Sequence, residues 1–135
     1  MSSAESNAIA VEHVTQKLVE KGFSVTERNR GQLQIVSKDS GKPLSIRVHA
    51  KKDSRVWILN ESEENPAGNC FYIFCLISDE NKVPEFHIVP GKDVAESIKN
   101  YHENYLKDEN HTDTTMREFH DEDNEYLDKW DLLNQ

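Results

Sequence analysis

One stretch of eight residues constrains the fold more than any other part of this 135-residue chain. Residues 70–77 read CFYIFCLI, an uninterrupted apolar run that is rich in aromatic and branched side chains. Because successive side chains of a strand point to opposite faces, a strand that is apolar at every position must be covered on both sides. The run therefore predicts a central β-strand in an α/β domain, with helices on both faces of the sheet.

The N-terminal segment predicts the first helix. Val14 and Leu18 belong to an apolar stripe with spacings of three and four, which is the helical repeat. Ser6 or Asn7 can cap the start of this helix, since short oxygen-bearing side chains accept from the free backbone N–H groups of the first turn. Gly22 is expected to end it, because glycine adopts left-handed backbone geometry without strain.

Between this helix and the apolar run the pattern changes to that of strands. Apolar or alternating segments predict strands at residues 23–27, 33–37, 44–50, 55–59 and 85–89. The polar segment 60–69 is expected to be a mobile loop, and residues 78–82 a turn. Asp93 with Glu96 forms a capping-box pattern at the start of a second helix. The expected architecture is a mixed β-sheet of about four to six strands flanked by helices, in the order helix, strands, helix.

The last 29 residues are acidic but contain apolar residues that a purely solvated tail would lack. These residues are Met116, Phe119, Tyr126, Trp130, Leu132 and Leu133. We expect an α/β domain at residues 1–106 and an acidic C-terminal tail at 107–135, partly packed on the same domain. Residues 119–124 are expected to be exposed.

Charge is distributed unevenly along the chain. The net charge is −9, but residues 28–55 hold eight Lys or Arg against two Asp, a local charge of +6. Residues 107–135 hold three bases and ten acids, a charge of −7. The acidic total argues against a general nucleic-acid binder. The basic segment is either an ordinary solvated hairpin or a surface for an anion, which could be a phosphate backbone or the acidic tail.

Several protein classes are excluded on composition. The two cysteines, Cys70 and Cys75, have no zinc or redox spacing and give no disulfide framework, which is typical of a reducing compartment. No apolar run approaches the roughly 20 residues that span a bilayer. The N-terminus has no signal-peptide pattern. We therefore expect a cytoplasmic protein that has no membrane segment.

The hairpin at residues 28–52 carries the strongest functional pattern. In its second strand Arg47 and His49 alternate with Ile46 and Val48, so Arg47 and His49 must project side by side from one face. This strand pair resembles the core of the PD-(D/E)XK, or restriction-endonuclease-like, superfamily. The resemblance extends to residues 71–76, to 84–90 (PEFHIVP), to a helix containing His102, and to the C-terminal segments 116–119 and 126–133. It implies a small single-domain member with a restriction-endonuclease-like sheet.

The residues that match the catalytic motif of that superfamily are not the catalytic ones. Gln34 stands at the Asp position, Arg47 at the Glu or Gln position and His49 at the Lys position. Metal-dependent phosphodiester cleavage needs carboxylate oxygens for Mg²⁺, and the permanent charge of Arg47 would repel that ion. We expect no catalytic residue at these positions, no metal site and no cofactor. Glu12 on the first helix or Lys51 could act as migrated catalytic groups.

The leading functional hypothesis is a non-catalytic nuclease-like module that binds nucleic acid or another anionic partner. The candidate binding residues are Arg28, Arg30, Lys38, Lys42, Arg47, His49, Lys51 and Lys52. A second hypothesis is a divergent metal-dependent nuclease with migrated residues. A third is a protein-interaction subunit that uses the segment 60–69. We also expect the acidic tail to lie near the basic face and to compete with outside anions.

Overall fold

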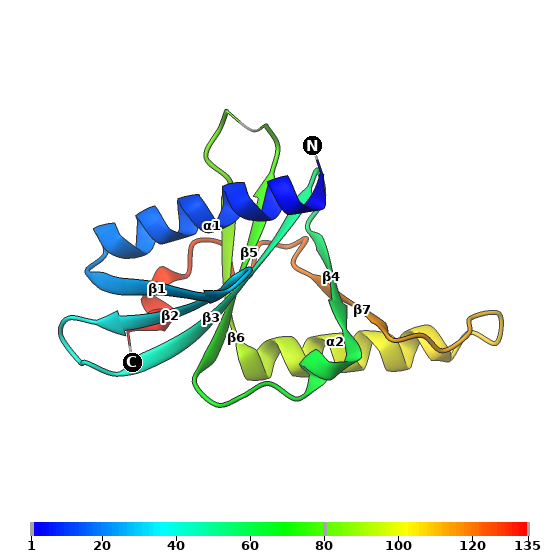
Figure 1. Ribbon diagram of the computed structural model, residues 1–135. Coiled ribbons are helices and arrows are strands. Elements are labelled where there is room, and N and C mark those ends of the chain that lie inside the picture. Colours follow the sequence, from blue (N-terminus) through cyan, green and yellow to red (C-terminus); the bar gives the residue numbers. More distant parts are fainter. Residues whose placement is uncertain (1, 80, 135) are drawn as a thin grey trace.

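The computed structural model describes residues 2–79 and 81–134 and forms a single α/β unit (Figure 1). Its elements in chain order are α1 (Ser3–Glu20), β1 (Phe23–Asn29), β2 (Gln32–Ser37), β3 (Pro43–Lys52), β4 (Val56–Asn60), the short 3₁₀ helix η1 (Glu61–Glu64), β5 (Cys70–Ile77), β6 (Glu85–Pro90), α2 (Gly91–Leu106), β7 (Met116–His120) and the 3₁₀ helix η2 (Trp130–Leu133). The predicted turn at 78–82 contains Glu80, which lies outside the described residues, as do Met1 and Gln135.

Five strands form the main sheet in the order β1-β2-β3-β5-β6. Only β3 and β5 run parallel; the other neighbours are antiparallel, so the sheet is mixed as expected. The apolar run 70–77 is strand β5, with the predicted bounds, and every residue in it except Leu76 is buried. Strand β4 leaves the main sheet and pairs with β7 in a separate two-stranded ribbon.

Each face of the sheet has its own hydrophobic core. On one face Val14 and Leu18 of α1 pack in a cluster with Ile46 and Val48 of β3. On the other face α2 and the β4–β7 ribbon cover β5 and β6, with Phe74 in their shared cluster. Figure 1 shows α1 and α2 on opposite sides of the strands. The two-sided cover that the apolar strand predicts is confirmed.

Both helix starts differ from the predicted ones. Helix α1 begins at Ser3 and is capped by Ser2, whose hydroxyl accepts from the backbone N–H of Glu5 at 3.1 Å, so the caps predicted at Ser6 and Asn7 are wrong. Helix α2 begins at Gly91 after Pro90 and has no side-chain cap. A β-strand runs directly into α2 here, and Asp93 therefore lies inside the helix rather than at its boundary.

The tail is more deeply packed than the sequence suggests. Strand β7 pairs with β4 along its length, and Phe119 and Asp121 are 1% and 4% exposed, so the prediction that residues 119–124 are exposed is wrong for these two. The expected anchor Trp130 is buried in the core beneath α1, whereas Met116 is 55% exposed and anchors nothing. The side-chain alternation of a strand explains this pattern, because Phe119 faces the core while Met116, at the strand end, does not.

Candidate functional site

The predicted pair Arg47 and His49 lies on the face of the sheet opposite α1. Their strand neighbours Ile46 and Val48 point into the core under α1, so the alternate side chains must point to the other face. On this face the ribbon and α2 cover β5 and β6, while side chains of β1, β2 and β3 stay partly or fully exposed. We call the face of β1–β3 that carries Arg47 and His49 the open face.

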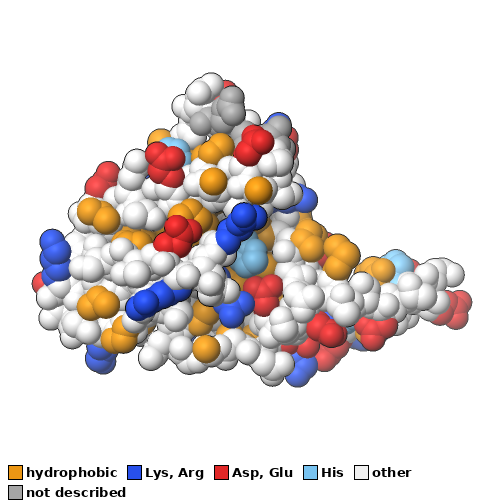
Figure 2. All heavy atoms as spheres, viewed as in Figure 1, with side chains coloured by type: hydrophobic (Ala, Val, Ile, Leu, Met, Phe, Trp, Pro, Cys, Tyr) orange, Lys and Arg blue, Asp and Glu red, His pale blue; other side chains and the backbone are white. Residues whose placement is uncertain are grey.

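Figure 2 shows a hollow where the sheet meets the β4–β7 ribbon and α2. A histidine side chain lies in this hollow, with basic and acidic side chains beside it. The side chains of Arg47 and His49 are 38% and 28% exposed, so a partner can reach both. The same face therefore offers a guanidinium and an imidazole to solvent.

A buried carboxylate completes the site. Oε1 of Glu63 lies 3.5 Å from Nη1 of Arg47 and 3.3 Å from Nε2 of His49, and it accepts a hydrogen bond from the Tyr72 hydroxyl at 3.1 Å. Oε2 accepts from the backbone N–H of Asn60 at 2.9 Å. We call these residues the Arg47–Glu63 site. Glu63 was not among the predicted site residues, although it is the residue that joins them.

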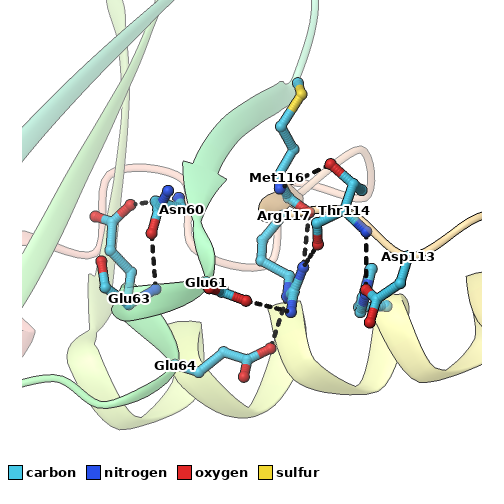
Figure 3. A network of polar contacts seen from close by, with 10 residues as sticks. Asn60, Glu61, Glu63, Glu64, Asp113, Thr114, Met116 and Arg117 are labelled. Carbon is cyan, nitrogen blue, oxygen red and sulfur yellow. Dashed lines mark hydrogen bonds and ion pairs between the residues drawn. The ribbon is translucent and has the colours of Figure 1, made fainter.

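Helix η1 holds Glu63 in this position. The side chain of Asn60 caps η1 by accepting from the backbone N–H of Ser62 at 3.0 Å. The Glu63 carboxylate in turn accepts from the backbone N–H of Asn60, and the two contacts belong to a capping box. Figure 3 shows Glu63 turned toward Asn60, while Glu61 and Glu64 extend toward Arg117 of β7. The prediction of a mobile loop at 60–69 is therefore wrong in its first half, where a capped turn buries a charged residue.

Arg117 anchors the other side of η1. Its Nε donates to Glu64 at 2.7 Å, its Nη2 lies 3.6 Å from Glu61, and its Nη1 donates to the backbone oxygens of Thr114 and Met116. Arg117 is itself 7% exposed. The C-terminal strand thus secures the turn that presents Glu63 to the open face.

The surroundings favour the charged form of Glu63. Burial raises the pKa of this carboxyl, but the His49 hydrogen bond and charge, the Asn60 backbone N–H and the Tyr72 hydroxyl together lower its pKa to about 2. Burial and the nearby negative charge of Glu63 raise the pKa of the Tyr72 hydroxyl, so Tyr72 stays a neutral donor. Glu63 is therefore an anion at any ordinary pH.

Aromatic rings hold the imidazole of His49 in place. Its ring stacks with Tyr72 at 5.7 Å between centroids and with Phe74 at 5.8 Å, both on β5. The rings of Tyr72 and Phe74 themselves stack at 5.4 Å. His49 can thus present its edge to Glu63 and to solvent with little rotational freedom.

Gln34 lies on the open face but binds a different residue. Its register partner on β3 is Ser45, so it projects to the same side as Arg47. The side-chain oxygen of Gln34 accepts from Nε of Arg28 at 2.8 Å and also from Nη2. The side-chain amide of Gln34 is therefore bound by the guanidinium of Arg28.

Of the two migrated catalytic groups considered from the sequence, Glu12 is not brought to the site. Glu12 is exposed on α1, which covers the opposite face of the sheet from Arg47 and His49. Lys51 follows His49 by two residues on β3, so by strand alternation it projects to the same face, nearer the end of the strand.

The predicted binding residues are spread over four places. Arg28, Arg47 and His49 share the open face, and Arg30 borders Glu12 and Glu27 beside α1. The remaining four lie at the two ends of β3, about 30 Å apart for a strand of this length. These four are Lys38 and Lys42 at the β2–β3 turn, and Lys51 and Lys52 at the other end.

Lys42 belongs to a separate cavity. This cavity has a volume of about 650 Å³ and lies where the β2–β3 turn meets the segment before β5 and the start of α2. Lys92 and the apolar Phe71 are among its lining residues. The lining also includes Pro66, Ala67, Gly68 and Asn69, so the second half of the segment 60–69 lies here and not at the Arg47–Glu63 site.

A second polar network is buried beside the ribbon, and we call it the His87 network. His87 is fully buried, with Nδ1 2.5 Å from Oδ2 of Asp121 and Nε2 2.6 Å from Oε1 of Glu85. Arg55 donates to both oxygens of Glu85, at 2.8 and 3.1 Å, and this hydrogen bond is the main reason that the pKa of Glu85 is lowered. Asp121 also accepts from backbone N–H groups of the tail, from Glu125 at 2.9 Å and from Tyr126 at 3.1 Å. This network binds the tail to β6.

The acidic tail makes no ion pair with Lys or Arg of residues 28–52 within the described part of the chain. Its acids pair instead with histidines: Asp113 with His102, and Glu118 and Glu122 with His120. Among the described residues the acidic tail is thus not ion-paired to the open face. The structure gives no contact that supports the expected competition between the tail and outside anions.

The residues of the site do not fit a hydrolytic metal ion. Mg²⁺ takes several oxygen ligands, but the site offers one carboxylate, and both oxygens of Glu63 already accept hydrogen bonds from Tyr72 and Asn60. Arg47 places a permanent positive charge 3.5 Å from that carboxylate. Within residues 2–79 and 81–134 no group of three or more His, Cys, Asp or Glu side chains is arranged to hold a metal.

Sequence reasoning missed Glu63, although a usable signal was present. Asn60 followed by Glu63 is a capping-box pattern of the same kind as Asp93 followed by Glu96, where the box was expected. The same pattern at Asn60 predicts the start of the helical turn η1. Nothing in the sequence indicates that the returning carboxylate also meets Arg47 and His49, which lie 16 and 14 residues earlier.

Comparison of the chain with protein-family models, with curated proteins and with solved structures finds no match. Among the described residues no helix has the length and apolar character needed to cross a membrane. The α/β architecture is therefore established by the structure, while the superfamily and the function are taken up below as proposals.

Proposed function

We propose that this chain is a non-catalytic, restriction-endonuclease-like module that binds an anionic partner, a nucleic-acid backbone, on its open face. The observation that carries the proposal is the state of Arg47. Its side chain is 38% exposed, and its guanidinium lies 3.5 Å from Glu63, which is longer than a hydrogen bond, and also interacts with the Cys70 thiol. A guanidinium has five N–H donors, so most of its hydrogen-bonding capacity stays available to phosphate oxygens.

The arrangement of the open face supports a phosphate partner. Arg28 and Arg47 lie on β1 and β3 of the same face, two strands apart, which corresponds to about 10 Å between backbones. Two guanidiniums at this spacing can contact separate phosphates of one strand. Polar side chains between them, such as Gln34 and Ser45, leave the surface hydrated rather than suited to an apolar ligand.

Non-catalytic binding is favoured over cleavage because of the groups at the site. The guanidinium of Arg47 stands where the superfamily pattern has a metal-ligating side chain, and Gln34 is bound to Arg28. A protein partner at residues 60–69 is less well supported, because η1 in this segment is turned inward by the buried Glu63.

The experiment is a titration of labelled single-stranded and duplex oligonucleotides, read by fluorescence anisotropy between about 50 and 200 mM salt. Arg47→Ala should weaken binding by roughly five- to tenfold and lower the slope of log K against log salt by about one. Lys99→Ala is the matched control, since Lys99 is an exposed cation on α2 and its loss removes the same charge.

Equal losses for the two variants would show that binding is only a response to net charge and would contradict the proposal. Oligonucleotide cleavage that requires added Mg²⁺ or Mn²⁺ would favour the divergent nuclease instead. Absence of binding at the lowest salt, with capture of a protein partner through residues 60–69, would favour the interaction subunit.

A further inference from the structure

Glu63 closes the capping box of η1, and its carboxylate also lies beside Arg47 and His49 of the open face. Its side chain is 9% exposed and lies next to the partly exposed guanidinium of Arg47 and imidazole of His49 on the open face. Burying a carboxylate is costly unless its oxygens are hydrogen-bonded, and Asn60 and Tyr72 supply such bonds. These bonds leave Oε1 directed also at Arg47 and His49, the groups that a phosphate would use.

We infer that Glu63 is a resident anion of the Arg47–Glu63 site, from which a phosphodiester group must take the Arg47 guanidinium in order to bind. This inference rests on the proposed function and specifies how the same site is regulated. Phosphate oxygens and the Glu63 carboxylate have the same charge sign and compete for the same N–H donors. The affinity of the site is therefore set by the difference between the two contacts.

The contacts on either side of Glu63 are unequal, which makes an exchange feasible. Toward Asn60 and Tyr72 the oxygen distances are 2.9 and 3.1 Å, within hydrogen-bond range. Toward His49 and Arg47 they are 3.3 and 3.5 Å. An incoming phosphate can thus take over the Arg47 contact, the longest of the four, while the contacts to Asn60, Tyr72 and His49 keep the carboxylate stabilised in place.

No atom has to leave the site for this exchange. Glu63 keeps its bonds to the backbone of Asn60 and to Tyr72, and η1 stays fixed by Arg117 on its far side. Arg47, which is 38% exposed, has the freedom to turn its guanidinium from Oε1 toward solvent. The movement therefore belongs to the arginine side chain and not to the backbone.

The test is Glu63→Gln, which keeps the size of the side chain and one acceptor oxygen for the Asn60 backbone N–H but removes the competing charge. We expect this variant to bind a short labelled oligonucleotide about fivefold more tightly than the unmodified protein, the upper end for a partly exposed ion pair. Glu61→Gln is the matched control. It removes the same charge from the same turn, but Glu61 pairs with Arg117, so its affinity should change less than twofold.

A double-mutant cycle separates competition from a general change in charge. In the Arg47→Ala background the gain from Glu63→Gln should shrink to less than twofold, because the contested guanidinium is gone. A gain of the same size in both backgrounds, or an equal gain from Glu61→Gln, would overturn the inference.

The two proposals fail in distinguishable ways. If the unmodified protein binds and Glu63→Gln binds equally or more weakly, the resident-anion inference is wrong and the proposed function stands. If neither protein binds at low salt, the proposed function is wrong and the inference falls with it.

A measurement on the unmodified chain covers the case in which Glu63→Gln does not fold. Oligonucleotide titration followed by ¹H–¹⁵N NMR should shift the Arg47 guanidinium signal and the backbone amide of Asn60, whose acceptor is Glu63. A shift at Arg47 with none at Asn60 would show that Glu63 does not respond to the ligand and would overturn the inference.

Discussion

The Arg47–Glu63 site and the His87 network are built from the same residue types, an arginine, a histidine and carboxylates, but they differ in how many donors are used. In the His87 network both ring nitrogens lie within 2.6 Å of carboxylate oxygens, and Arg55 holds Glu85 with two bonds. In the Arg47–Glu63 site His49 and Arg47 lie 3.3 and 3.5 Å from a single carboxylate oxygen of Glu63. In the His87 network the histidine is buried and both of its ring nitrogens are used, so the network stabilises the fold. In the Arg47–Glu63 site the side chains of Arg47 and His49 are partly exposed and keep hydrogen-bonding capacity for a ligand.

The difference follows from position in the fold. His87 lies on β6 beneath the ribbon and the tail, and its side chain is fully buried. His49 lies on β3 at the margin of the covered region, with a side chain that is 28% exposed. A displacement of two strands across the sheet, from β6 to β3, is enough to turn a buried histidine that joins two carboxylates into a partly exposed one.

The largest effect is expected from His87→Ala. This change removes a hydrogen-bond partner from Asp121, which is buried, and from Glu85, which is partly exposed. Breaking a buried pair typically costs about 3–5 kcal/mol. Urea denaturation should show a loss of that size in the free energy of unfolding. His120→Ala, in a partly exposed histidine that also pairs with two carboxylates, is the control and should cost less than about 1 kcal/mol. Similar losses in the free energy of unfolding for both variants would contradict the distinction between a buried structural network and partly exposed histidine pairs.

An intermediate effect is expected from acid. Since the pKa of folded Glu63 is about 2, below its ordinary value of 4.5, its contribution to stability is complete above pH 4.5 and is lost as the pH falls toward 2. That contribution is roughly 3 kcal/mol for a shift of this size. In Glu63→Gln this part of the acid dependence should be missing, as read from denaturation midpoints across this pH range.

Glu61→Gln serves as the control for the acid experiment, because Glu61 is 53% exposed and pairs with Arg117 at 3.6 Å. Its acid dependence should match that of the unmodified protein closely. If Glu63→Gln loses stability over the same pH range as the unmodified protein, Glu63 does not have the lowered pKa that its contacts imply.

The smallest effect on stability is expected from His49→Ala. Because its contact with Glu63 is 3.3 Å long and its side chain is partly exposed, this change should cost less than about 1 kcal/mol at neutral pH. The pKa of Glu63 should rise, since the His49 hydrogen bond is a leading reason that it is low. An NMR titration of the Glu63 carboxyl carbon checks this. A loss as large as that of His87→Ala would remove the contrast between the two networks.

Much of the layered fold could be predicted because it depends on local periodicity. The apolar run of β5 indicates a strand that is covered on both faces, and the alternation around Arg47 and His49 correctly predicts that they share one face. The caps at Ser2 and Asn60 were missed because several Ser and Asn residues near each helix start fit the same rule. Local rules give the type of an element more reliably than its first residue.

The site residues that sequence reasoning missed are those whose role depends on distant contacts. Asp121 looks like part of a solvated acidic run, yet it is buried because His87, 34 residues earlier, lies opposite its carboxylate. Glu63 likewise sits in a polar segment that is typical of a loop. A charged residue in such a run has the same sequence pattern whether it is solvated or paired, since the pairing partner lies on another element.

The amino-acid sequence by itself determined the α/β layering, the central buried strand and the shared face of Arg47 and His49, because hydrophobic burial and side-chain alternation act between near neighbours. Only the tertiary structure decided that Glu63 occupies the Arg47–Glu63 site, that the tail is locked by His87 and that the basic residues divide into separate groups. Burying a charge depends on which partners the fold brings within a few ångströms of it, and those partners come from segments that are far apart along the chain.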